Sequence, residues 1–256
     1  MTESESAGFG LSISRPTPLQ GKIVAETLVD KIEDRLVTAL ALGLYVEHQQ
    51  LPPERELAAT LGVSRVTMRE ALRRLVDAGY VEVRRGRNGG HFVRADWGPG
   101  SAARVRRQLG DDWQHFEDLF DARTLIEPLI ARTAAIRCTE EFAPRIREAV
   151  QAYVDAPDHD ASRLADAEVH YAIALAAQNP LLLSLSQQLR TAVSLDLGAE
   201  PYSDEARRAA IEHHRQLSDA VIMGRADEAA AIAAEHFAMS ERLIRELIER
   251  ASSVDD

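Results

Sequence analysis

A break in helical periodicity between residues 54 and 93 constrains the fold of this chain more than any other feature. Residues 54–61 and 65–78 each place apolar side chains on one face at helical spacing, and a tight turn separates them. Gly62 suits the position that follows a helix end, and Ser64 is a favourable N-cap for the next segment. The pattern predicts two short helices packed across a tight turn.

Strand-like alternation replaces the helical pattern immediately afterwards. Residues 80–84 and 91–93 have the alternation of strands, and the turn between them at 85–90 is rich in glycine and asparagine. Residues 22–44, ahead of the paired helices, carry leucine and isoleucine at the spacing of an amphipathic helix. We therefore expect three helices followed by a two-stranded wing.

The rest of the chain predicts helices alone. Residues 97–101 have the composition of a linker, and no strand-like alternation follows them. The expected helices cover residues 101–109, 112–137, 139–154, 160–178, 180–196, 203–223 and 226–251. Together they predict an all-α antiparallel bundle, so the whole fold should be mostly α. The expected divisions are a flexible tail at 1–20, a front module at 21–95 and the bundle at 101–251.

Charge is distributed unevenly between the two expected modules. The chain has 256 residues and a formal net charge of −11, which taken alone disfavours nucleic acid as a partner. Residues 21–94, however, carry 12 lysines and arginines against 10 acidic residues, whereas residues 95–256 carry 17 against 29. This asymmetry indicates two modules with different partners and places the acidic surplus in the bundle.

Composition also limits the compartment. Cys138 is the single cysteine, which excludes an intramolecular disulfide and favours a reducing cytoplasm. Charges interrupt every apolar run well before the roughly 18–20 residues that a membrane span needs. The polar N-terminal residues lack the basic and apolar regions of a signal peptide. We expect a cytoplasmic protein with no membrane partner.

The paired helices have the residues that a helix-turn-helix needs. Ala58 is small where the two helices would touch, Gly62 lies in the turn, and Met68 would lock the second helix onto the first. Such a unit projects the N-terminal residues of its second helix, here including Arg65 and Arg69, into the major groove. Arginine can bind guanine O6 and N7 there. The front module is therefore predicted to bind double-stranded DNA.

Four segments of the front module closely resemble the winged helix-turn-helix of GntR-family transcription regulators. They are LPPERELA at 51–58, LGVSR at 61–65, REALRRL at 69–75 and GGHFV at 89–93. The resemblance implies base-reading roles for Arg55, Arg65 and Arg69. It implies backbone or wing contacts for Ser64, Thr67, Arg85 and Gly86. Val66 stands where some relatives carry a hydroxyl, so one polar contact is expected to be missing.

Three histidines and an aspartate in the bundle have the spacing of a metal site. Asp166 and His170 are four residues apart, so both project from one helix face. His214 and His236 lie at similar heights on consecutive antiparallel helices. Three imidazoles and one carboxylate suit Zn²⁺, Ni²⁺ or Mn²⁺. From spacing alone, separate histidines remain the default interpretation, and His213 competes with its neighbour as a ligand.

The bundle resembles the FCD ligand-binding domain of FadR-type GntR regulators. The matching features are the DAR and ARTAA segments between residues 121 and 135, the Asp-x3-His pair, QNP at 178–180 and the final two histidines. The resemblance implies a divalent metal whose coordination is completed by a small carboxylate effector. The implied protein ligands are Asp166, His170, His214 and His236. It favours His214 over His213, because His214 is followed by arginine in the His-Arg frame of the family.

The resemblance also indicates effector-binding residues beside the metal set. Arg123 corresponds to the pocket arginine of such domains, although a salt bridge to Glu127 one turn on explains it equally well. Asn179 and Arg190 are further candidates. A helix cap or a surface position would account for these two equally well.

The combined pattern predicts a ligand-responsive transcriptional regulator rather than an enzyme. A homodimer would read an inverted repeat, and a metal-bound carboxylate would shift the population that binds the operator; we expect repression. A metalloenzyme is an alternative of another class, but Glu168 points away from the Asp166 and His170 face, which leaves no clear general base. A pure metal sensor, with the metal itself as effector, is the other alternative.

Overall fold

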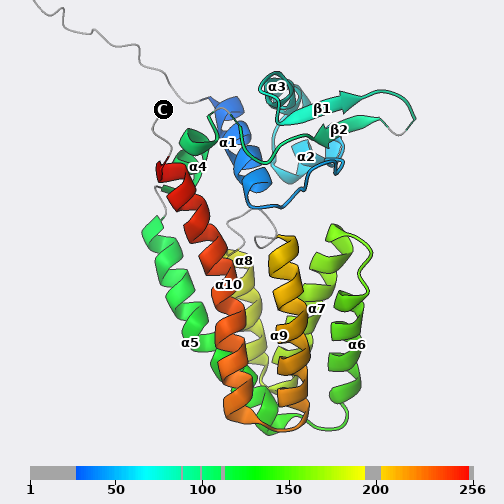
Figure 1. The fold of residues 1–256 in the computed structure, drawn as a ribbon, viewed down its shortest axis with the longest axis vertical. Coiled ribbons are helices and arrows are strands. Elements are labelled where there is room, and N and C mark those ends of the chain that lie inside the picture. Colours follow the sequence, from blue (N-terminus) through cyan, green and yellow to red (C-terminus); the bar gives the residue numbers. More distant parts are fainter. Residues whose placement is uncertain (1–26, 88, 99, 111–112, 194–202, 254–256) are drawn as a thin grey trace, which may run out of the picture.

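The computed structural model describes residues 27–87, 89–98, 100–110, 113–193 and 203–253. The tail expected at 1–20 and the last residues of the helix expected at 180–196 lie outside them. Figure 1 shows a front module that contains both strands, placed against one end of a bundle of longer helices. The front module contains α1 (Leu28–Ala41), α2 (Glu54–Thr60), α3 (Arg65–Asp77), β1 (Val81–Arg84) and β2 (Gly90–Val93). The remaining helices are α4 (Ser101–Gly110), α5 (Trp113–Arg137), α6 (Ala143–Val154), α7 (His159–Ala176), α8 (Pro180–Val193), α9 (Asp204–Ile222) and α10 (Ala226–Ser253).

Glycine and serine set the turn between α2 and α3. Gly62 adopts φ +64°, and the N–H of the residue after it turns back to the carbonyl oxygen of Ala58 at 2.9 Å, which ends α2. Ser64 then caps α3, because its hydroxyl accepts from the backbone N–H of Thr67 at 3.1 Å. Ala58 and Met68 are buried where the helices meet. The predicted helix-turn-helix and its wing are therefore confirmed.

The wing is an antiparallel pair of strands in a single register. Val81 faces Val93 at its base, and residues 48–51 bond to the outer edge of β2. Its tip requires a glycine at position 89, because a Cβ on Gly89 would lie 2.5 Å from the carbonyl oxygen of Arg84. The wing extends to one side of the helices of the front module, as Figure 1 shows.

Three predicted helix boundaries in the bundle are wrong by a few residues, and one of them belongs to the helix expected at 226–251, which ends at Ser253. The helix expected at 139–154 begins at Ala143, because a proline follows directly and fits only the first turn of a helix. The helix expected at 160–178 ends at Ala176, because Gln178 takes a left-handed φ of 49°. The all-α bundle itself is confirmed, with α5 and α10 lying side by side along its length.

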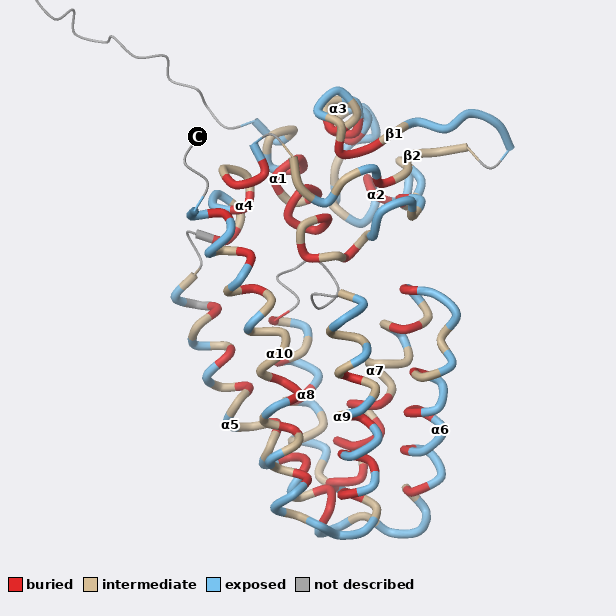
Figure 2. Tube along the Cα trace, viewed as in Figure 1, coloured by how far each residue is buried: buried red, intermediate tan, exposed pale blue. Residues whose placement is uncertain are grey.

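Both parts contain buried residues along their helices (Figure 2), and most of these residues are apolar. One cluster fills the front module around Met68, and a second fills the bundle around Ile146. A third cluster joins the two parts, because Leu42 of the front module packs with Leu109 of α4 and Ile244 of α10. Within the described chain, no helix has both the length and the apolar character needed to cross a membrane.

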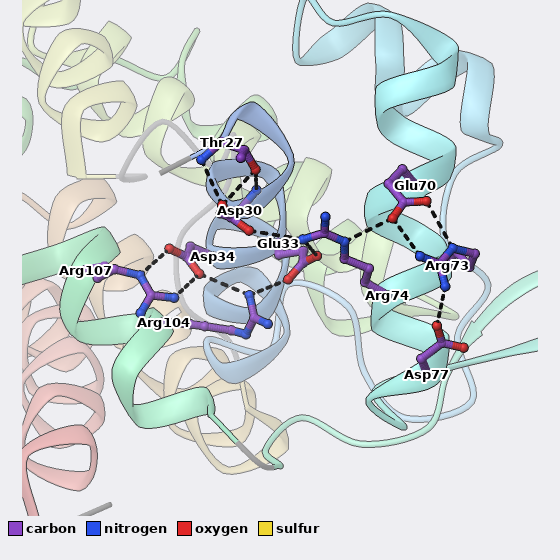
Figure 3. Close-up of polar contacts among 10 residues, drawn as sticks. All are labelled: Thr27, Asp30, Glu33, Asp34, Glu70, Arg73, Arg74, Asp77, Arg104 and Arg107. Carbon is purple, nitrogen blue, oxygen red and sulfur yellow. Dashed lines mark hydrogen bonds and ion pairs between the residues drawn. The ribbon is translucent and has the colours of Figure 1, made fainter. Parts of the chain in front are cut away.

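Two buried acidic residues on α1 connect α3 to α4 (Figure 3). Glu33 and Asp34 are each 2% exposed. Arg104 of α4 lies 2.6 Å from Glu33, and Arg107 donates two hydrogen bonds of 2.8 Å to Asp34. Arg74 of α3 lies 3.3 Å from Glu33. Because a buried carboxylate is costly once its partner is removed, these pairs hold α3, α1 and α4 in one arrangement.

Candidate nucleic-acid interface and metal centre

Figure 1 places α3 on the part of the front module that is farthest from the bundle, and Arg65, Val66 and Arg69 in its first turns are exposed. The side chains of Arg65 and Arg69 are 63% and 65% exposed. The hydroxyls of Ser64 and Thr67 lie 2.7 Å apart beside them, and Val66 is exposed on the same turn. The residues that the resemblance assigned to DNA on α3 therefore share one accessible surface.

Glu54 organises this surface, and sequence reasoning missed it. Its carboxylate accepts hydrogen bonds from Arg69 Nε at 3.0 Å and Nη2 at 2.8 Å, and lies 3.9 Å from Nε of Arg65. Hydrogen bonding to Arg69 is the main cause that lowers the pKa of Glu54 below its ordinary value, so the carboxylate stays ionised. Arg55, the next residue on α2, is exposed. Because Glu54 and Arg69 are 15 residues apart on different helices, their spacing carries no signal.

The wing supplies a second exposed basic surface. Arg85 and Gly86 are both exposed at its tip. Arg84 stacks on Phe92, with its guanidinium carbon 4.1 Å from the ring centroid, and pairs with Glu82 at 2.7 Å. The front module thus carries basic groups both on α3 and on the wing, which is the arrangement that two separate DNA contacts would need.

The four residues predicted to bind a metal converge between α7, α9 and α10. The Nε2 atom of His236 lies 3.3 Å from that of His214 and 3.2 Å from that of His170. One carboxylate oxygen of Asp166 lies 3.5 Å from Nε2 of His170, and the other lies 3.5 Å from Nε2 of His214. The four ligand atoms fall within 4.8 Å of one another. His213 contributes no atom to this group, and its ring centroid is 5.9 Å from that of His236.

This geometry fits a divalent cation. Ligand atoms about 2.1 Å from one ion are roughly 3.0 Å apart in octahedral and 3.4 Å apart in tetrahedral coordination, and the nitrogen separations of 3.2 and 3.3 Å fall between. Burial, followed by the neighbouring His214 and His170, holds the pKa of His236 well below its ordinary value, so this ring is neutral and suited to metal ligation. Burial opposes ionisation of Asp166, but the histidines and Arg123 outweigh it and hold the pKa at about 2.

A cavity of about 480 Å³ opens beside the histidine cluster. Asp166 and His236 form part of its wall, and so does Arg190 of α8. Arg123 is 2% exposed, and its guanidinium carbon lies 4.5 Å from the ring centroid of Phe237. The positive charge of Arg123 helps to lower the pKa of Asp166. Arg123 therefore affects the cluster through Asp166, whereas the wall of the cavity is formed by other residues.

Asn179 lies apart from the cavity, at the start of α8. Its side-chain oxygen accepts from the backbone N–H of Leu181 at 3.0 Å, which is the capping position that the sequence left open. Arg163 of α7 and Arg207 of α9 line the cavity, although sequence reasoning missed both. Helical spacing could have indicated Arg163, because it precedes Asp166 by three residues.

Comparisons with known proteins agree with this architecture. The family model described as bacterial regulatory proteins, gntR family, matches residues 28–93, and the FCD domain model matches residues 118–239. RmpR of Mycobacterium gastri is 32% identical over 233 residues, which are 88% of this chain and 84% of that protein. The galactonate operon transcriptional repressor of Escherichia coli strain K12 is 28% identical over 222 residues, which are 85% of this chain and 97% of that protein.

Two further similarities extend the comparison. The Uxu operon transcriptional regulator of Escherichia coli strain K12 is 33% identical over 220 residues, which are 83% of each chain. A solved GntR structure from Streptococcus agalactiae is 28% identical, covers 84% of this chain and 100% of its own, and gives a TM-score of 0.43. A winged helix-turn-helix joined to an FCD bundle defines a transcriptional regulator rather than an enzyme. The chain belongs to the GntR family, in the FadR-like group, whose members bind DNA operators.

Proposed function

We propose that this regulator is a repressor whose operator affinity is set by a divalent metal and a small carboxylate bound in the bundle. The observation that carries the proposal is the convergence of three imidazole nitrogens and a carboxylate beside a cavity. Asp166, His170, His214 and His236 would hold Zn²⁺, Ni²⁺ or Mn²⁺. The metal would supply an electrophilic position for a carboxylate oxygen.

The surroundings of the cluster support an organic acid as effector. Arg190 lines the cavity and offers a cation to an acid, and Arg123 helps to keep Asp166 ionised. Asn179 is better explained as the cap of α8. The name of the Escherichia coli relative refers to galactonate, which is itself a hydroxycarboxylate. Residues 101–251 are assigned to effector binding and to the dimer contact.

Operator reading is assigned to residues 21–95. Arg55, Arg65 and Arg69 would read bases from the major groove, while the N-terminal hydroxyls of α3 and the wing would contact the backbone. The backbone set is Ser64, Thr67, Arg85 and Gly86. Val66 is 76% exposed, and its methyl groups suit the methyl group of thymine rather than a phosphate.

The homodimer contact is assigned to the outer face of α5, which carries a self-complementary stripe. Its exposed positions include Asp121, Leu125, Leu129 and Arg132, at spacings of three and four residues. Leu125 and Leu129 are 67% and 52% exposed. If two α5 helices pair antiparallel about a two-fold axis at the leucines, Asp121 of each subunit meets Arg132 of the other. Arg132 is 3.1 Å from Asp227, whose side chain is 91% exposed, so Arg132 can change partner at little cost.

Release of DNA by a carboxylate in a metal-dependent way tests the proposal. DNA selected from a random pool by the wild-type protein would be labelled and followed by fluorescence anisotropy. Organic acids should release this DNA from protein loaded with Zn²⁺, and should not release it from protein treated with a chelator. Release from both preparations would contradict the role of the metal, and retention of DNA with every acid would contradict the carboxylate effector.

The same titration separates the alternatives. A pure metal sensor would change its DNA affinity with Zn²⁺ alone, before any acid is added. A metalloenzyme would need a general base beside the metal. Glu168 does not suit that role, because it pairs with Arg145 at 2.7 Å and its side chain is 46% exposed. Measuring DNA affinity with Zn²⁺ and no acid therefore distinguishes the metal-sensing mechanism from the carboxylate-responsive one.

A further inference from the structure

We propose that the effector is a dianion, with one carboxylate at the histidine cluster and a second anionic group bound by arginines farther along the cavity. The second group is a carboxylate or a phosphate, and a dianion here means a ligand with two separate anionic groups. This inference rests on the proposed function, because it takes the first carboxylate at the metal as given. It is carried by the length of the cavity and by the charges on its wall.

The cavity extends along α7 from the cluster towards the start of the helix. Asp166 and His170 line it at the cluster, whereas Asp160, Ser162 and Arg163 line it nearer the front module. At about 1.5 Å per residue, Arg163 is roughly 4.5 Å and Asp160 roughly 9 Å from Asp166 along the helix axis. The cavity therefore has a second polar region at a distance that a carbon chain of about four to six atoms spans.

Arg207 contributes a fixed positive charge to this second region. Its Nε donates to the hydroxyl of Ser162 at 3.1 Å, and its Nη2 donates to the carbonyl oxygens of Tyr153 and Ala156 at 3.3 and 3.0 Å. All three acceptors are neutral, and within the described chain no carboxylate pairs with Arg207. A half-buried guanidinium that is held only by neutral oxygens is a positive charge fixed in position and left without a counter-ion.

The remaining charges on the wall favour the same ligand. The wall carries Arg163, Arg190 and Arg207 against Asp160 and Asp166. Asp166 directs its oxygens to the histidines, and Asp160 accepts the side-chain amide of a front-module glutamine at 3.4 Å. Among the described residues, Arg190 has neither an ion pair nor a hydrogen bond. A divalent metal adds two positive charges, so one carboxylate leaves the cavity strongly cationic and a second anion is favoured.

Matched acids test this inference on the full-length protein loaded with Zn²⁺, after its metal content has been measured. Calorimetric titration would compare straight-chain dicarboxylates of four to six carbons with ω-hydroxy monocarboxylates of the same length. An ω-phosphorylated acid of each length forms a third arm, which distinguishes phosphate from carboxylate as the second group. We expect the better dianion to bind at least ten-fold more tightly than its matched monocarboxylate.

Substitutions locate the preference. Arg190→Gln and Arg207→Gln should each reduce the ratio of dianion to monocarboxylate affinity at least five-fold, whereas Arg208→Gln, on the exposed neighbour, should keep the wild-type ratio. Arg190→Gln is the variant least prone to unfolding, because Arg190 has no hydrogen bond to lose within the described chain. Equal affinity for the matched acids, or an unchanged ratio in both variants, would overturn the inference and leave the proposed function intact. Failure of the metal-loaded protein to bind either series would instead overturn the carboxylate effector itself.

Discussion

Arginines gather at two sites in this molecule, and their surroundings differ. On the surface of α3, Arg65 and Arg69 are mostly exposed, and the carboxylate of Glu54 contacts both of them. In the bundle cavity, Arg207 is half-buried and held by neutral oxygens. Salt screens exposed charges strongly and enclosed charges weakly. The outer site therefore suits a polyanion that makes many contacts, and the inner site suits discrimination among small ligands by their charge.

The largest expected effect is at the histidine cluster, because its loss would remove the metal that is proposed to bind the first carboxylate in the inner site. His214→Ala should lower bound metal from about one ion per chain to less than a tenth, and should abolish stabilisation by added Zn²⁺. A ligand at about 100 times its Kd stabilises a protein by about 2.7 kcal/mol, so the loss should be visible as a lower Tm. Metal analysis and thermal-shift measurements provide the check. His213→Ala is the matched control, and equal metal loss in both variants would refute this site.

Arg65→Ala breaks the outer site and should have the next largest effect. A bidentate contact between arginine and guanine contributes about 1–3 kcal/mol, so we expect operator binding to weaken roughly 10- to 100-fold. Anisotropy titrations must be made at one fixed salt concentration, because phosphate contacts make affinity salt-dependent. Arg145→Ala removes an exposed arginine that pairs with Glu168 on the bundle, and it should leave binding unchanged. Comparable weakening in both variants would indicate a general charge effect instead of base reading.

Pairing of two α5 helices through the stripe would bring the outer sites of two subunits together in a dimer. Leu129→Glu should raise the dimer Kd at least ten-fold in sedimentation velocity, whereas Met223→Glu, at another exposed apolar position, should not. Asp121→Arg should also weaken the dimer, and combining it with Arg132→Asp should restore it. A double variant as weak as the single one would rule out the antiparallel pairing.

The smallest expected effect concerns His159, near the contact between the two parts. Burial, and then the charge of Arg163, lower the pKa of this histidine from 6.5 to about 4. As the pH falls from 7 towards 4, the unfolded chain takes up a proton here while the folded chain does not, so the folded state loses stability. His159→Gln should remove a contribution on the order of 1 kcal/mol. Urea denaturation with a chelator present should then show a flatter dependence of unfolding free energy between pH 7 and 5; a wild-type slope would contradict the assignment.

The fold was predictable because each element marks its own ends and its own inner face. Ser64 and Gly62 define a helix start and a helix end through contacts with residues only a few positions away. Spacing alone left separate histidines as the default, and the resemblance to FCD domains selected Asp166, His170, His214 and His236 as one set. Helical spacing places the first two on one face, and a short antiparallel connection sets the height of the other two.

Contacts between distant helices could not be predicted in this way. Glu54 is 15 residues from Arg69, and Ser162 is 45 residues from Arg207, so each contact depends on how two helices pack rather than on local spacing. Asn179 shows the converse case, because the same amide could have faced the cavity or capped α8, and only packing determines which. The sequence, with its family resemblance, thus indicated the Asp166 and histidine cluster, but it did not reveal the charges on the rest of the adjoining cavity.

The apolar cluster shared by the two parts determines how this chain can be divided. Leu42 and Leu44 of the front module are buried together with Leu109 and Ile244. A fragment that ended near residue 98 would expose these two leucines to water, at a cost of roughly 1.5–3 kcal/mol each. Such a fragment should therefore self-associate. A front module of this type fused to a foreign bundle would need a matching apolar surface on that bundle. Without such a surface, a change in the bundle could not alter the position of the front module.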